Sequence, residues 1–126
     1  MSETTFYLCK DCGNLVALLH RGSCTPQCCG KPMVELKANS TDAAQEKHVP
    51  ICTRKGDTVE VQVGSTLHPM EEKHHIMWIA LSQRGRLDVR FLHPGEEPKA
   101  VFEHVADSGA TVYAYCNLHG LWKAEL

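Results

Sequence analysis

The C-terminal two thirds of the chain carry a repeated β-strand pattern. Apolar and polar residues alternate at 59–63 and again at 87–91, as they do in strands with one buried face. A continuous apolar run at 76–81 has the length of a strand buried at the centre of a sheet, and shorter apolar segments at 100–102 and 111–115 indicate two more strands. Turn-forming residues separate these segments, and the sequence shows no long helical period. The pattern predicts a mainly β fold, an antiparallel β-sandwich.

The N-terminal third has a different composition. Residues 1–36 have few large apolar side chains but hold five of the seven cysteines of the chain. A piece this small usually needs a metal or disulfides to fold. The small polar residues that follow indicate a linker at 37–47, in which Thr41 or Asp42 is a candidate cap for one short helical turn. We therefore expect a metal-stabilised domain at 1–36 and a sandwich domain at 48–126.

The charge balance and the cysteine count narrow the possible functions. The 126 residues include 13 basic and 15 acidic ones, whereas nucleic-acid and anionic-membrane binders need a basic excess. No apolar run approaches the roughly 20 residues of a membrane helix, and the N-terminal residues do not resemble a signal peptide. An odd number of cysteines without an export signal favours metal-binding thiolates over a disulfide scaffold. We expect neither a nucleic-acid nor a membrane partner.

Four cysteines near the N-terminus have the spacing of a metal site. They form a CxxC motif and an adjacent pair, each followed by glycine: Cys9, Cys12, Cys28 and Cys29. Two residues between thiols let a tight turn direct both sulfurs toward one ion, and four thiolates suit tetrahedral zinc or iron. The residue types alone leave a small zinc ribbon and an iron site both open. Cys24 is an alternative to Cys28 as a ligand, but Gly30 directly after the adjacent pair favours Cys28 and Cys29.

A second candidate site combines histidines with one cysteine. Its members lie at strand ends or in turns: His48, His68, His74, Cys116 and His119. Zinc is usually satisfied with four ligands, so four imidazoles and a thiolate favour a redox-active transition metal with one open position. Spacing alone does not choose between His74 and His75, because neighbours in a strand point to opposite faces. The remaining candidates are expected to be surface histidines and a core thiol: His20, His93, His104 and Cys52.

Three stretches of the second site carry a resemblance to a known family. They are Glu46-Lys47-His48-Val49-Pro50, the segment from His68 to His74, and Tyr115-Cys116-Asn117-Leu118-His119-Gly120-Leu121-Trp122-Lys123. Together with the four-cysteine pattern, which resembles the FeS4 module desulforedoxin, they resemble desulfoferrodoxin, the two-iron form of superoxide reductase. The resemblance implies an immunoglobulin-like β-sandwich with an Fe(His)4(Cys) centre. It implies His48, His68, His74 and His119 as equatorial ligands and Cys116 as the axial one, and it selects His74 over His75.

The resemblance also implies an activity and its partners. Superoxide would be reduced by one electron to hydrogen peroxide at an open sixth site, without production of oxygen. The 37–47 segment would then be a linker and active-site loop, in which Lys47 steers the anion and Glu46 resembles the residue that occupies the sixth position of the ferric form. A rubredoxin-like electron donor, a homodimer and a cytoplasmic location are implied as well. The alternatives are a non-catalytic two-iron electron-transfer protein and a zinc ribbon fused to a sandwich.

Overall fold

The computed structural model describes residues 3–126, which fall into two compact units. The smaller unit is Thr4–Lys37, and the larger one is Ala38–Leu126 together with Glu3. The smaller unit contains five short strands: β1 (Thr5–Leu8), β2 (Leu15–Leu18), β3 (Gln27–Cys28), β4 (Lys31–Pro32) and β5 (Val34–Glu35). Strands β2, β1 and β5 form a three-stranded antiparallel sheet, and β3 pairs with β4 as a hairpin. Its small core centres on Tyr7, Cys9 and Met33, so little besides the cysteines is available to stabilise it.

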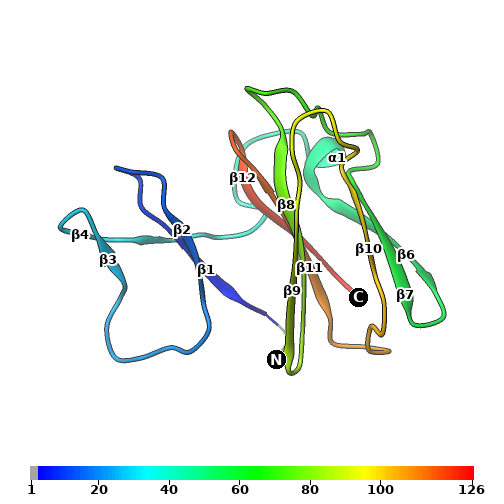
Figure 1. Ribbon diagram of the computed structural model, residues 1–126, viewed down its shortest axis with the longest axis horizontal. Coiled ribbons are helices and arrows are strands. Elements are labelled where there is room, and N and C mark those ends of the chain that lie inside the picture. The colour runs from blue at the N-terminus through cyan, green and yellow to red at the C-terminus, as the bar shows by residue number, and fades with distance from the viewer. Residues whose placement is uncertain (1–2) are drawn as a thin grey trace. The chain divides into compact units, whose positions relative to one another are not determined.

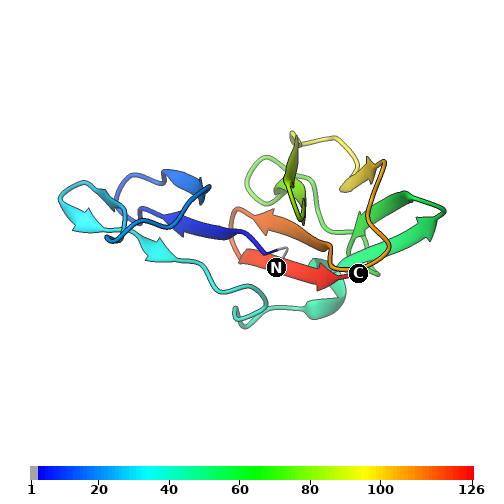
Figure 2. The ribbon, with the colours of Figure 1, turned by 90° about the horizontal axis from the view of Figure 1, so that it is seen from below.

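The larger unit is an antiparallel β-sandwich preceded by one helical turn. Its elements are α1 (Gln45–His48), β6 (Pro50–Lys55), β7 (Thr58–Val63), β8 (Ile76–Gln83), β9 (Arg86–Phe91), β10 (Lys99–Phe102), β11 (Thr111–Cys116) and β12 (Gly120–Glu125). One sheet has the order β10-β7-β6 and the other the order β12-β11-β8-β9, and Figure 1 shows the two groups of strands on opposite sides of the unit. The view in Figure 2 shows β11 and β12 side by side, in orange and red.

The core of the sandwich lies between the two sheets. Val59, Val61 and Val63 of β7 are buried there, opposite the inner side chains of β8 and β11, while Glu60 between them is exposed. Burying these apolar faces is the main contribution to the stability of the unit. The immunoglobulin-like β-sandwich and the five strands expected from the sequence are confirmed. Strands β6 and β12 were not predicted, because polar and charged residues interrupt their apolar pattern.

A β-bulge interrupts the pairing of β8 with β11. Tyr115 pairs with Trp78, but the next residue, Cys116, pairs with Ile76, so Met77 is the extra residue. Met77 is 39% exposed, whereas Ile76 is fully buried in the core. The bulge therefore shifts the inward-facing positions of the chain before β8 by one residue.

The helical turn differs in place from the expectation. Neither Thr41 nor Asp42 caps it; the N-cap is Ala44, which makes no side-chain capping bond. The turn instead ends on the buried His48, whose ring nitrogen Nδ1 lies 2.7 Å from the Ala44 carbonyl oxygen. Tertiary contacts of His48 thus determine where this short turn forms. No helix among residues 3–126 is long and apolar enough to span a membrane.

Candidate metal centres

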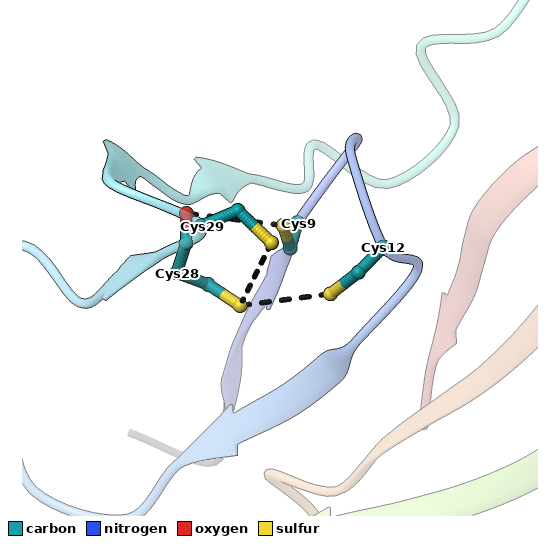
Figure 3. Close-up of side chains that lie close together, drawn as sticks. All are labelled: Cys9, Cys12, Cys28 and Cys29. Carbon is teal, nitrogen blue, oxygen red and sulfur yellow. Dashed lines mark hydrogen bonds between the residues drawn. The ribbon is translucent and has the colours of Figure 1, made fainter.

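The smaller unit brings four thiols together. Figure 3 shows that Cys9 and Cys12, from the loop after β1, point their sulfurs toward those of Cys28 and Cys29, from the β3–β4 hairpin. The four sulfurs lie within 4.8 Å of one another, with 3.6 Å between those of Cys12 and Cys28. These distances exceed the 2.05 Å of a disulfide. Sulfurs at about 2.3 Å from one tetrahedral ion lie about 3.8 Å apart, so the cluster has the size of a metal-thiolate site.

A two-residue hairpin turn explains how adjacent cysteines serve one site. Cys29 and Gly30 both have positive φ, 54° and 73°, as in the turns that suit two-residue hairpins. The turn brings the sulfurs of Cys28 and Cys29 to the same side, 4.0 Å apart. Contact with the neighbouring Cys12 raises the pKa of Cys29 to about 12, whereas the backbone amide of Cys12 lowers the pKa of Cys9 to about 7. Contacts with Cys12 and Cys9 raise the pKa of Cys28 as well, and a cation bound among the sulfurs would favour the thiolate forms of Cys28 and Cys29.

Four histidine rings of the larger unit form a closed square. His48, His68, His74 and His119 follow one another around it, with neighbouring ring centroids 4.7, 4.7, 5.1 and 4.9 Å apart, and 6.4 Å between His48 and His74 across it. Each neighbouring pair meets edge to face. The rings come from the end of α1, from the loop between β7 and β8, and from the β11–β12 turn.

In two of the four rings, the nitrogen that faces a neighbouring ring carries a lone pair. Nδ1 of His48 and Nδ1 of His68 each donate to a backbone carbonyl, those of Ala44 and Pro69, at 2.7 Å. Burial lowers the pKa of His68 to about 4 and lowers that of His48, so both rings are neutral and their Nε2 atoms are unprotonated. These two Nε2 atoms nevertheless lie 3.2 Å apart. Two nitrogens bound at a right angle to one ion, each at about 2.1 Å, lie about 3 Å apart.

His74 and His119 complete the same arrangement. Nε2 of His74 is buried and has no hydrogen-bond partner among the described residues, a costly state for a polar atom unless a ligand satisfies it. His119 presents Nδ1, which lies 3.2 Å from Nε2 of His48. Four ring nitrogens thus converge, two of them with lone pairs facing each other and one buried without a partner, and a metal ion accounts for their position.

A buried thiol belongs to the same site. The sulfur of Cys116, which is fully buried, lies 3.8 Å from Nδ1 of His119 and accepts the His119 backbone N–H at 3.4 Å. The donor atoms of Cys116 and of the first three histidines lie within 4.8 Å of one another. Burial raises the pKa of Cys116, and the amides of Leu118 and His119 act in the opposite direction. A neighbouring cation favours the thiolate that metal ligation requires.

Close backbone packing holds His48 and His68 together. The loop 64–68 lies against α1, where Thr66 N–H and the Ser65 hydroxyl both donate to the Glu46 carbonyl, at 2.9 and 3.2 Å. A Cβ at Gly64 would lie 2.6 Å from that carbonyl oxygen, so only glycine fits there. Figure 1 shows α1 and the chain that follows β7 at the same end of the sandwich.

Trp122 supports two members of the square, and neither composition nor spacing points to it. Its buried indole stacks on the His48 ring at 4.8 Å and 23°, and its Nε1–H donates to the His119 carbonyl oxygen at 3.1 Å. It lies on β12, a strand that the sequence pattern did not predict, next to the equally buried Leu121. The structure shows that it also contacts two of the five donors.

Glu46 and Lys47 lie on α1, next to His48. Both are exposed, and among residues 3–126 neither forms an ion pair or a side-chain hydrogen bond. The Lys47 ammonium nevertheless acts on the site. Burial lowers the pKa of His74, the charge of His119 lowers it further, the charge of Glu71 acts in the opposite direction, and the charge of Lys47 adds a smaller lowering. An unneutralised positive charge therefore stands near the ring nitrogens.

The other candidate residues lie outside both clusters. His75 is half-buried, and its Nδ1 lies 3.1 Å from the Glu71 carbonyl oxygen. Cys24 is exposed beside Ser23, and Cys52 packs against the sandwich core. The three remaining histidines are exposed: His20, His93 and His104.

Comparison with known proteins identifies the family. The desulfoferrodoxin family pattern matches residues 40–125, and the pattern of the desulfoferrodoxin N-terminal domain matches residues 2–36. The chain belongs to the desulfoferrodoxin family. It is 49% identical to desulfoferrodoxin of Syntrophotalea carbinolica over 94% of each chain. It is 38% identical to superoxide reductase of Pyrococcus horikoshii, over 75% of this chain and 97% of that protein.

Comparison with solved structures supports the same family. The crystal structure of the superoxide reductase from Treponema pallidum matches with a TM-score of 0.77 and 30% identity, over 98% of this chain and 99% of that one. The two side-chain clusters fit the two iron centres of desulfoferrodoxin, one of four cysteines and one that includes His48, His68, His74 and Cys116. The orphaned Nε2 of His74 is the observation in this chain that shows the fit most directly.

Proposed function

We propose that the protein is a superoxide reductase, an oxidoreductase that acts on superoxide as acceptor. It converts superoxide to hydrogen peroxide by one-electron reduction, without releasing oxygen. The observation that carries the proposal is the convergence of four imidazole nitrogens and one thiol in the larger unit. The superoxide reductases of Pyrococcus horikoshii and Treponema pallidum support it as relatives of this chain.

Each of the five residues would offer one donor atom to the metal. His48, His68 and His74 offer Nε2, and His119 offers Nδ1. The carbonyls of Ala44 and Pro69 hold two of the rings in the tautomer that leaves Nε2 free. Five protein donors leave one position of a six-coordinate ion for a small ligand.

The fifth donor, Cys116, gives the centre its thiolate. Amide N–H groups directed at a thiolate sulfur moderate how much electron density it passes to a metal. When bound, iron supplies the electron and the Lewis acidity that stabilises the developing peroxide charge. The protein holds the five donor residues in place, and Glu46 and Lys47 directly precede one of them, His48.

Lys47 is proposed to attract and orient the substrate anion. The chain has a net charge of −2, so its overall field does not attract superoxide. The Lys47 charge acts on His48 and His74 and is not neutralised by an ion pair within residues 3–126. It would therefore supply a local positive field that attracts the anion, and it would order water molecules that can protonate the product.

Glu46 is proposed as the carboxylate that approaches the metal when the centre is oxidised. Its side chain is exposed and unpaired among the described residues, so it is free to move. A carboxylate would suit the harder ferric ion, and Glu46 would bind ferrous iron less well.

We propose the remaining features on the family resemblance. An external rubredoxin-like protein reduces the catalytic iron, and the chain works as a homodimer in the cytoplasm. Residues 1–36 act as an FeS4 domain, 37–47 as linker and active-site loop, and 48–126 as the catalytic domain. The four-cysteine centre has a structural role, because the thin core of the smaller unit needs it.

Iron analysis combined with product stoichiometry tests the proposal. The purified full chain should carry two irons and, with a reductant, yield one hydrogen peroxide per superoxide consumed without oxygen release. A dismutase yields half as much peroxide, together with oxygen. An electron carrier yields no catalytic peroxide, and a zinc protein is colourless. Any of these three results would contradict the proposal.

A further inference from the structure

Asn117 links two segments that each carry a member of the histidine–cysteine site. Its Oδ1 accepts the His75 backbone N–H at 2.9 Å, and its Nδ2 donates to the Lys73 carbonyl oxygen at 3.0 Å. Its own backbone N–H donates to the His75 carbonyl oxygen at 3.2 Å. The amide orientation is fixed by its partners, because an N–H can only donate and a carbonyl can only accept. Asn117 thus bonds the residue before His74 and the residue after it.

His74 depends on this link more than its neighbours do. The rings of His48 and His68 are each oriented by an Nδ1–H bond to a carbonyl. No such bond to a described residue holds the His74 ring, whose Nε2 is buried without a partner. Two backbone bonds with Glu71, both 3.0 Å, shape the turn before His74 but do not connect it to the Cys116–His119 turn.

We propose that Asn117 is a positioning residue that sets His74 against Cys116 and His119. Asn117 lies directly after Cys116 in the chain, so its three hydrogen bonds fix the His74 backbone relative to the thiol and, two residues further on, to the His119 ring. This inference deepens the proposed function and rests on the metal centre described there. A ligand placed by backbone bonds alone is displaced when those bonds are lost, because its ring has no second anchor.

Ferrous iron affinity of the full-length protein tests the inference. Asn117→Ala removes both side-chain bonds and should weaken iron binding at this centre about 10–100-fold in anaerobic competition with a ferrous chelator. The four-cysteine centre of the same molecule should release iron as in the wild type, which makes it an internal reference. The thiolate-to-iron absorption band of the oxidised catalytic centre should shift as well, a change that lost stability alone does not produce.

Gln83→Ala is the matched control. The Gln83 amide also accepts a backbone N–H, that of Ala106 at 2.9 Å, and donates to a backbone carbonyl, that of His104, but it joins segments that carry none of the five donors. It should leave affinity and spectrum unchanged. Should Asn117→Ala not fold, Asn117→Ser carries the test, because its short side chain cannot reach both partners and should weaken affinity in the same direction.

Wild-type affinity and spectrum in the folded Asn117 variant would overturn the inference, and so would an equal loss in Gln83→Ala. Neither result would affect the proposed function. A wild-type protein that holds no iron at this centre would instead overturn the proposed function itself.

Discussion

Replacing Gly64 by alanine tests whether backbone packing sets the distance between two metal-binding histidines. The added Cβ would lie 2.6 Å from the Glu46 carbonyl oxygen, 2.9 Å from the Lys47 carbonyl carbon and 3.0 Å from the His48 nitrogen. All three atoms are backbone, so no side-chain rotation relieves the overlap. The loop 64–68 and α1 must therefore move apart.

The size of that movement follows from the contact distances. The Cβ would fall about 0.8 Å short of the 3.4 Å at which ordinary contact begins. Overpacking of this kind costs about 1–3 kcal/mol, which lowers the melting temperature of a domain this size by about 4 °C or more. The movement also separates His48 from His68, whose Nε2 atoms lie 3.2 Å apart. Metal-ligand distances tolerate only about 0.2 Å, so iron affinity should fall about tenfold or more.

Thermal unfolding and chelator competition on the full chain measure both effects. Gly22→Ala is the control, since a Cβ there meets nothing within 4 Å and its φ needs no glycine. A Gly64→Ala variant with the melting temperature and iron affinity of the wild type would refute the reasoning. A loss of stability with unchanged affinity would show that the α1 contact does not position the ligands.

Three further substitutions examine the surroundings of the centre. Lys47→Ala should slow the second-order reaction with superoxide about tenfold or more and flatten its dependence on ionic strength; stopped-flow rates that match the wild type at every salt concentration would remove the steering role. Glu46→Ala should shift the absorption band of the oxidised thiolate-ligated iron, and identical spectra across the pH range would argue against carboxylate ligation. Trp122→Phe keeps a ring against His48 but leaves the His119 carbonyl without its indole donor. It should lower the free energy of unfolding by about 1–3 kcal/mol, and denaturant curves that superimpose on the wild type would contradict this.

The choice between His74 and His75 shows what sequence patterns leave undetermined. Unbroken alternation backward from the buried Ile79 would place Met77 and His75 on the core side. The bulge at Met77 shifts the phase, so that Ile76 is buried and His74 joins the other rings. No residue in this stretch signals a bulge, which depends on pairing with β11. The family resemblance selected His74 from the spacing of the family motif, which periodicity alone does not provide.

The residue types predicted the metal-binding side chains, but they did not predict the groups that hold those side chains in place. Cys, His and their spacing indicate metals because few other side chains bind them. The partners that orient these donors are backbone carbonyls, a glycine and an indole: Ala44, Pro69, Gly64 and Trp122. These groups carry no metal-binding signature, and only the folded backbone brings them to the site. The helical turn was likewise misplaced, because its position follows from His48 and not from a capping residue.

An iron-loaded, chemically reduced crystal structure of the full chain tests the central claim most directly. The account predicts an iron ion held by Nε2 of His48, His68 and His74, by Nδ1 of His119 and by the sulfur of Cys116, with no protein atom in the sixth position. A ferrous centre whose sixth position is filled by a side chain, or whose nitrogen ligands include His75 in place of His74, would contradict it.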